Sequence, residues 1–210
     1  MTHYSLIQQV STSLKDTLSP MLGGTDTRFV DPTTSVVAAN DIVFDSPAEL
    51  TLGANSMLSV FLYAVTPNPH MRNLPVRTFN THDVDGNLLD SGGAREQDIL
   101  LDFYYMITPY GQNRNIDYEI TERIVQLFHR YPSIAQTAGA LFDNGNDEIF
   151  IEPQSLTLDE MNKIWSVFPN KAYRMSLFYQ VPSVMIAAAK PEATVYRWKK
   201  NTVNMKQKKN

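Results

Sequence analysis

Residues 57–72 read MLSVFLYAVTPNPHMR, an apolar run that two prolines close abruptly. In an extended chain its side chains divide into two faces, with Met57, Ser59, Phe61, Tyr63 and Val65 on one and Leu58, Val60, Leu62 and Ala64 on the other. β-Branched and aromatic residues are typical of strands, and Pro67 and Pro69 end the run. We therefore expect a central strand that is covered on both faces.

A second stretch of the same kind, ILLDFYYMITPY at residues 99–110, is predicted to pair with the first. Between the two lies Asp85-Gly86, a dipeptide that supplies the positive φ angles of a tight hairpin turn. Residues 76–79 and 88–89 are expected to form the arms of this hairpin, which would project from the sheet.

Three helices are predicted from apolar residues at helical spacing. The first covers residues 4–21, the second has its N-cap within residues 115–117 and ends before Pro132, and the third begins with a capping box at Thr157 and Glu160. Trp165 lies on the apolar face of the third helix and is expected to be buried.

The remaining strands are expected at residues 35–38, 42–44, 148–152 and 172–181. This order of elements predicts an α+β fold in a single domain. A central mixed, mostly antiparallel sheet is flanked by helices and carries the projecting hairpin.

Composition excludes several classes of protein. The chain has 210 residues, 43% of them hydrophobic, which is enough to bury a full core. It has no run of 18 apolar residues and no apolar segment typical of a signal peptide, so we expect cytoplasmic assembly and no membrane partner. The absence of cysteine excludes disulfides, a thiolate nucleophile and cysteine-based zinc sites.

Charge is distributed unevenly along the chain. Residues 197–210 carry six basic side chains and no acid, while the remainder has 12 basic and 22 acidic residues and a net charge of -10. We therefore divide the chain into a domain at residues 1–190 and a basic C-terminal arm at residues 191–210. The arm is either a solvated tail or a segment that binds an acidic neighbour through Tyr196, Arg197, Trp198, Lys199, Lys200, Lys206, Lys208 and Lys209.

Patterns for catalysis or metal binding are weak. No two histidines have the spacing of a helical zinc site, and the segment from Thr81 to Gly92 lacks the carboxylates that begin and end a calcium loop. The sequence has no nucleophile elbow and no phosphate-binding loop, and its acidic body would repel nucleic acid. Asp102 could be a catalytic base, but a structural pair with a basic group is the simpler interpretation.

Four blocks of sequence, in order, resemble the tail-terminator or cap family of phage-tail-like extracellular contractile injection systems. They are Leu62–Asn68 with Met71–Pro75, then Leu101–Thr108 with Tyr110-Gly111, then Glu152-Pro153 with Leu156–Trp165, and last Tyr173–Gln180. The resemblance covers about residues 4–187. Residues 92–97 depart from it, because the family has a proline-containing segment there, and the basic arm lies outside it.

The resemblance implies a structural protein without catalytic activity or cofactor. It implies a ring of six identical subunits that ends the inner tube and sheath at the end distal to the baseplate and anchors the last sheath layer. Its partners would be its own copies and the tube and sheath proteins, in a particle that either stays in the cytoplasm or is released. The alternative is a small-molecule binding domain or hydrolase with an unrecognised site.

Overall fold

The structure of the protein is a computed structural model that describes residues 6–26, 35–51, 55–69, 77–82, 88–95, 99–134, 149–186 and 194–196, with the backbone alone described for 77–82, 88–95 and 194–196. The chain forms two compact units. One comprises Met1–Arg72 and Ile99–Ile186, and the other comprises Asn73–Asp98 and Ala187–Asn210. The predicted boundary between residues 190 and 191 stays a prediction.

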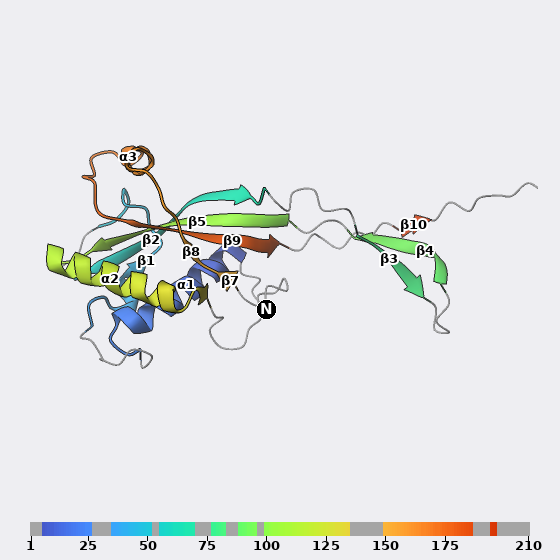
Figure 1. Cartoon of the computed structure of the whole chain (residues 1–210), viewed down its shortest axis with the longest axis horizontal. Helices are drawn as coiled ribbons and strands as arrows, with labels where there is room; N and C mark the ends of the chain where they lie inside the picture. The colour runs from blue at the N-terminus through green and yellow to red at the C-terminus, as the bar shows by residue number, and fades with distance from the viewer. Residues whose placement is uncertain are drawn as a thin grey trace, which may run out of the picture. The chain divides into compact units, whose positions relative to one another are not determined.

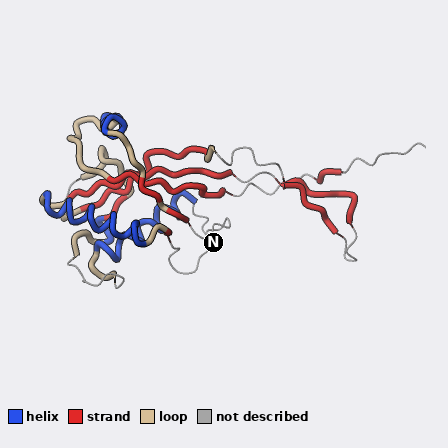
Figure 2. Tube along the Cα trace, viewed as in Figure 1, coloured by secondary structure: helices blue, strands red, loops and turns tan. Residues whose placement is uncertain are grey.

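The first unit is built on a five-stranded sheet with the order β1-β2-β5-β9-β8. Its long strands are β2 (Met57–Pro67), β5 (Ile99–Tyr110) and β9 (Leu177–Ile186), and the short strands β1 (Ile42–Val43) and β8 (Glu152–Pro153) lie at its edges (Figures 1 and 2). β1 is parallel to β2, and the other pairs are antiparallel. The predicted α+β class and the pairing of residues 57–67 with 99–110 are confirmed.

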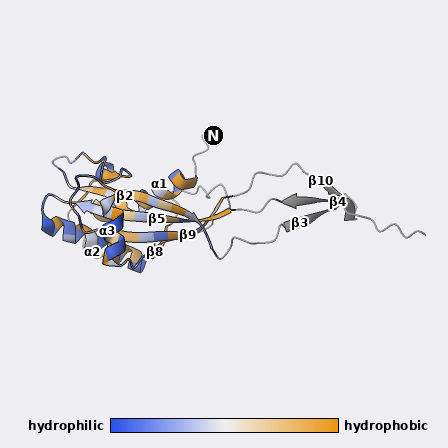
Figure 3. Ribbon diagram, turned by 90° about the horizontal axis from the view of Figure 1, so that it is seen from above, coloured by the Kyte–Doolittle hydropathy of each residue, from blue (hydrophilic) through white to orange (hydrophobic). Residues whose placement is uncertain are grey.

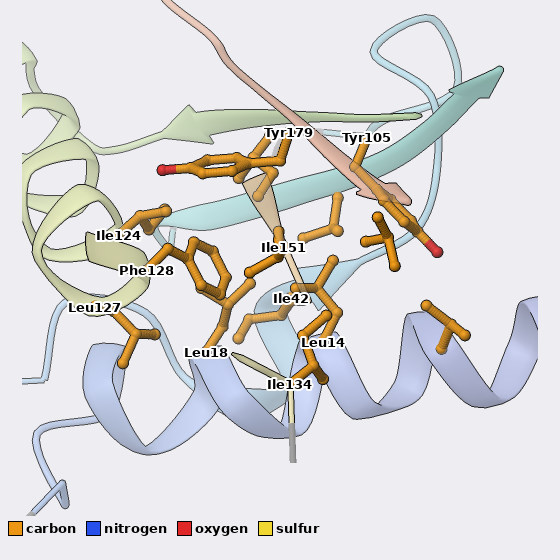
Figure 4. Close-up of a cluster of buried hydrophobic side chains, with 14 of the residues drawn as sticks. Leu14, Leu18, Ile42, Tyr105, Ile124, Leu127, Phe128, Ile134, Ile151 and Tyr179 are labelled. Carbon is orange, nitrogen blue, oxygen red and sulfur yellow. The ribbon is translucent and has the colours of Figure 1, made fainter. Parts of the chain in front are cut away.

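Helices α1 (Leu6–Leu22) and α2 (Arg114–Arg130) lie on one face of this sheet (Figure 1). The side chains of the main core converge between the helices and the sheet in Figure 4, among them Leu14, Leu18, Ile124, Leu127, Phe128, Tyr105 and Tyr179. Tyr105 is fully buried, its hydroxyl lies 3.0 Å from Ser11 Oγ, and burial raises its pKa to about 12. The predicted apolar faces of both helices are therefore confirmed. Short strands β6 (Ser133–Ile134) and β7 (Ile149–Phe150) add Ile134 and Ile149 to the same core.

Helix α3 (Leu158–Ser166) covers the opposite face over a smaller cluster that contains Met106, Trp165, Phe168 and Phe178 (Figure 1). The capping box between Thr157 and Glu160 is present, and Trp165 is buried, so both predictions are confirmed. β2 is thus packed on both faces as far as Tyr63, whereas Val65 is 39% exposed. Figure 3 shows the hydrophobic stretches along β2 and β5.

A β-bulge in β2 changes the predicted alternation of its side chains. Leu62 lies opposite Tyr105 and Ala64 lies opposite Tyr104, so Tyr63 is an extra residue with no partner in the register with β5. Residues opposite each other in a ladder share a face. Val65, opposite Phe103, therefore lies on the face of the main core and not on the face of Tyr63, as the uninterrupted alternation predicted.

Residues 35–38 do not form the predicted strand. The amides of Val36 and Val37 both donate to the carbonyl of Leu22, at 2.9 and 3.3 Å, and so satisfy the C-terminal end of α1. A single 3-10 turn, η1 (Ala39–Asp41), follows and leads into β1. The amides that would have joined a sheet ladder are used as a helix cap.

The predicted strand at residues 172–181 begins later, at Leu177, and continues to Ile186. Before Leu177 the segment is held by side chains and not by a ladder, because Thr108 Oγ1 bonds Ser176 Oγ at 2.8 Å and Arg174 donates to the carbonyl of Pro109. The N-cap of α2 is also displaced, to Asn113, whose side chain accepts from the amide of Ile116.

The second unit contains a three-stranded sheet with the order β10-β4-β3. Strands β3 (Arg77–His82) and β4 (Leu88–Arg95) are antiparallel, which confirms the predicted hairpin with longer arms; its turn at Asp85-Gly86 lies outside the described residues. β10 (Thr194–Tyr196) pairs with residues 91–93 of β4. In the sequence β3 follows β2, β4 precedes β5 and β10 follows β9. The order β3-β4-β10 therefore repeats the order β2-β5-β9 of the long strands of the first unit.

Candidate interaction surfaces

The basic residues of the predicted arm, Arg197, Lys199, Lys200, Lys206, Lys208 and Lys209, lie outside the described residues, as does Trp198. Tyr196 is described in its backbone and is the last residue of β10, opposite Ser91. Thr194 and Val195 lie opposite Gly93 and Gly92. The basic segment therefore begins directly after a strand that the hairpin binds, which the sequence pattern did not predict.

Asp102, in β5, joins β9 and the residue that follows β2 through neutral hydrogen-bond donors. Its Oδ1 accepts from Asn68 Nδ2 and from the amide of Ser183, both at 2.9 Å, and its Oδ2 accepts from Gln180 Nε2 at 3.2 Å. Asp102 is 3% exposed. Within the described part of the chain these amides occupy the place that the prediction gave to a basic group, so the carboxyl group is a structural junction of the sheet.

A bulge in β9 makes this junction possible. Leu101 lies opposite Val184 and Phe103 opposite Val181, so β9 has one residue more than β5 between the two pairs. Ser183 accommodates the extra residue with a φ of 57°, in the left-handed region that residues other than glycine rarely adopt. This turns its amide onto Asp102.

A hollow of about 350 Å³ lies where β5 ends and α2 begins. Its lining includes Arg174, whose guanidinium lies over the ring of Tyr110 at 4.7 Å from the centroid. The same guanidinium donates a hydrogen bond to the carbonyl of Pro109 at 3.3 Å and lies 3.5 Å from Asp117 Oδ2. Burial raises the pKa of Tyr110, and the charge of Arg174 partly opposes that rise. The arginine is thus fixed at the surface, with 37% of its side chain exposed.

The floor of this hollow depends on Gly111. The other oxygen of Asp117 accepts from the Gly111 amide at 2.6 Å, and a Cβ at Gly111 would lie 2.9 Å from Ile116 Cγ2. Only glycine fits between β5 and the first turn of α2 without a shift of the helix. Sequence reasoning did not identify Arg174, because the predicted strand at 172–181 placed it in a regular ladder.

A second hollow, of about 370 Å³, lies between α2, α3 and the edge formed by β8 and β9. Its apolar lining includes Val125, Leu156, Met161 and Phe178. The described residues contain no group of three or more His, Asp or Glu side chains able to hold a metal ion. No described helix is long and apolar enough to cross a membrane.

The sequence model of one family, described as the Pvc16 N-terminal domain, matches residues 9–197. No curated protein matches the chain. These 189 matched residues extend into both compact units of the structure, with β1 to β10 all inside the match.

Solved structures share the fold, among them the following two. One is a cryo-EM structure of the PVC sheath/tube terminator of an extracellular contractile injection system in the extended state, with a TM-score of 0.60 and 17% sequence identity over 100% of this chain and 66% of that one. The other is the tube-terminating cap of the anti-feeding prophage, with a TM-score of 0.54 and 17% identity over 95% of this chain and 62% of that one. The chain spans less than two thirds of the length of either protein, and the likeness is one of fold.

Proposed function

The chain belongs to the Pvc16 N-terminal domain family, and from this premise we propose that it acts as a tail terminator of a contractile injection system. Six copies form a ring that ends the inner tube and the sheath at the end distal to the baseplate and anchors the last sheath layer. The observation that carries the proposal is the family match over residues 9–197. The solved terminator with the same fold over the whole chain supports it.

The fold suits such a role because it offers shape and sheet edges. A ring of identical subunits needs two different contact patches on each copy, and a terminator needs a surface that fits the last layer of its tube or sheath. Hydrogen bonds and packing supply these contacts without a reacting group, so the protein acts as a structural part and not as an enzyme. Its partners are further copies of itself and the tube and sheath proteins, and assembly takes place in the cytoplasm.

Deletion of the gene tests this proposal. In a strain that makes the particle, we expect tubes and sheaths of uncontrolled length, or particles that contract before release, because nothing ends their polymerisation. Electron micrographs of purified particles measure the length distribution. Complementation with the intact chain should restore a single length, and particles of normal length in the deletion strain would exclude the terminator role.

The basic arm is proposed to contribute to docking through its charges and aromatic residues. Tyr196 and Trp198 give apolar contact area, and exposed ion pairs of under about 1 kcal/mol each add mainly orientation and association rate. Such contacts weaken as salt screens them. The partner is an acidic surface on a neighbouring subunit or on the last sheath layer.

Two truncations separate the charges from the strand that precedes them. A chain that ends after Tyr196 keeps β10 and loses all six basic residues, whereas a chain that ends after Glu192 also loses the pairing with β4. We expect both truncated chains to occupy fewer particles than the intact chain. Occupancy by the intact chain should fall as salt rises, and the truncation after Tyr196 should remove this dependence. Quantitative immunoblots of purified particles at low and high ionic strength measure this; equal occupancy of all three chains at every salt concentration would leave the arm without a role.

A further inference from the structure

The hollow at the end of β5 is lined by Arg174, which is held in place but does not use all of its hydrogen-bond donors. A guanidinium has five N–H donors, and within the described part of the chain Arg174 makes one hydrogen bond, to Pro109, and one longer ion pair, to Asp117. Stacking on Tyr110 fixes its plane. A guanidinium fork with donors to spare matches a carboxylate, which it can bind through two parallel hydrogen bonds.

The rim of the hollow has the residue types of a protein interface. Tyr118 is 55% exposed, Tyr173 is 50% exposed and Met175 is 37% exposed, and all three line the hollow. Tyr173 is held by an edge contact of its ring with Trp165, at 5.7 Å between centroids. Tyrosine, methionine and arginine are enriched where proteins bind each other, and tyrosine and arginine carry much of the binding energy.

We infer that this hollow binds an acidic segment of a second copy of the chain, residues 83–87 between β3 and β4 with Asp83 and Asp85, and that Arg174 is the group that receives a carboxylate. The inference rests on the proposed ring of identical subunits. A closed ring joins two different patches on each subunit. The hollow belongs to one compact unit and the hairpin to the other, so each copy carries both patches.

Charge favours this occupant. Asp83 and Asp85 stand two residues apart in the sequence that joins β3 to β4, with no basic residue between them, and Arg114 adds a second exposed cation to the hollow. The only acid that lines the hollow, Asp117, is engaged by Gly111 and Arg174. A carboxylate from outside would therefore meet donors and not repulsion.

The experiment measures self-association of the full chain, 23.8 kDa as a monomer, by sedimentation velocity over a range of concentrations. We expect Arg174→Ala and Asp83→Ala/Asp85→Ala each to weaken association by about tenfold or more, the scale of a lost hydrogen bond to a charged group. Tyr118→Ala should weaken it as well without affecting folding, because this side chain is exposed. Lys163→Ala is the matched control: it removes an exposed cation that is paired with Asp159 on α3 and does not line the hollow, and it should leave association unchanged.

A charge exchange gives the decisive comparison. Arg174→Asp alone should abolish association, and combining it with Asp83→Arg/Asp85→Arg should restore a substantial part. Thermal unfolding of each variant separates a lost contact from a lost fold. The inference is overturned if folded Arg174→Ala and Tyr118→Ala chains associate like the unaltered chain, if the exchange restores nothing, or if the chain is a monomer at every concentration. The first two results leave the terminator role intact, which the deletion strain tests separately.

Discussion

Trp165→Ala should lower the free energy of unfolding by about 3 to 5 kcal/mol, through lost contacts and the cavity left behind. The indole is 6% exposed and joins α3 to the sheet through Phe168 and the cluster around Met106 and Phe178. A domain of this size is stable by only about 5 to 15 kcal/mol, so much of the chain should unfold or aggregate near physiological temperature. Urea unfolding followed by circular dichroism measures the loss.

Trp165→Phe is the control for this prediction. The indole Nε1–H is buried and has no acceptor among the described residues. Phenylalanine keeps most of the aromatic packing and removes a donor whose burial without a partner costs about 1 to 3 kcal/mol, which offsets part of the lost volume. We expect a loss well below that of the alanine variant. Equal losses for the two variants, or a folded alanine variant that still forms rings, would contradict the packing of α3 described above.

Asp102→Ala should cost about 3 kcal/mol, because it removes the acceptor of three hydrogen bonds at a buried position. The amide of Ser183 loses its partner at the strained bulge of β9, while Asn68 keeps its bond to Ser183 Oγ at 3.1 Å. The same urea experiment applies, with hydrogen exchange of the Ser183 amide as a local readout. Faster exchange there should accompany the loss of stability.

Asp102→Asn separates the hydrogen bonds from the charge. Its amide oxygen can take the place of Oδ1 and accept from Asn68 and Ser183, and Gln180 can turn its carbonyl toward the new amide nitrogen. All three contacts then persist, so we expect a loss of about 1 kcal/mol. If the asparagine variant were as unstable as the alanine variant, the network would depend on the charge itself and not on the acceptor geometry.

Much of the fold was predictable from the sequence because its strongest patterns are local. The stretches at residues 57–67 and 99–110, the apolar faces of α1 and α2 and the capping box at Thr157 each depend on residues within one element, and all are confirmed. The resemblance to tail terminators, drawn from four short blocks of sequence, is confirmed by the family match.

What the sequence did not predict depends on contacts between distant residues. The bulge at Tyr63 changes which face Val65 occupies, and the amides of residues 36–37 cap α1 instead of entering a ladder. Arg174 is fixed at the surface by contacts with Pro109 and Asp117, which are more than fifty residues away in the sequence. Local propensity carries no information about such partners.

The position of β5 in the middle of the sheet has a consequence for how the protein is made. β5 pairs on one side with β2, about forty residues earlier, and on the other with β9, which begins at Leu177. During synthesis on the ribosome, one edge of β5 therefore stays unpaired until residues 177–186 have emerged. Contacts between residues far apart in the sequence slow folding. An unpaired strand edge can also pair with other nascent chains. We expect folding only after release of these residues, and a benefit from chaperones that shield the nascent sheet.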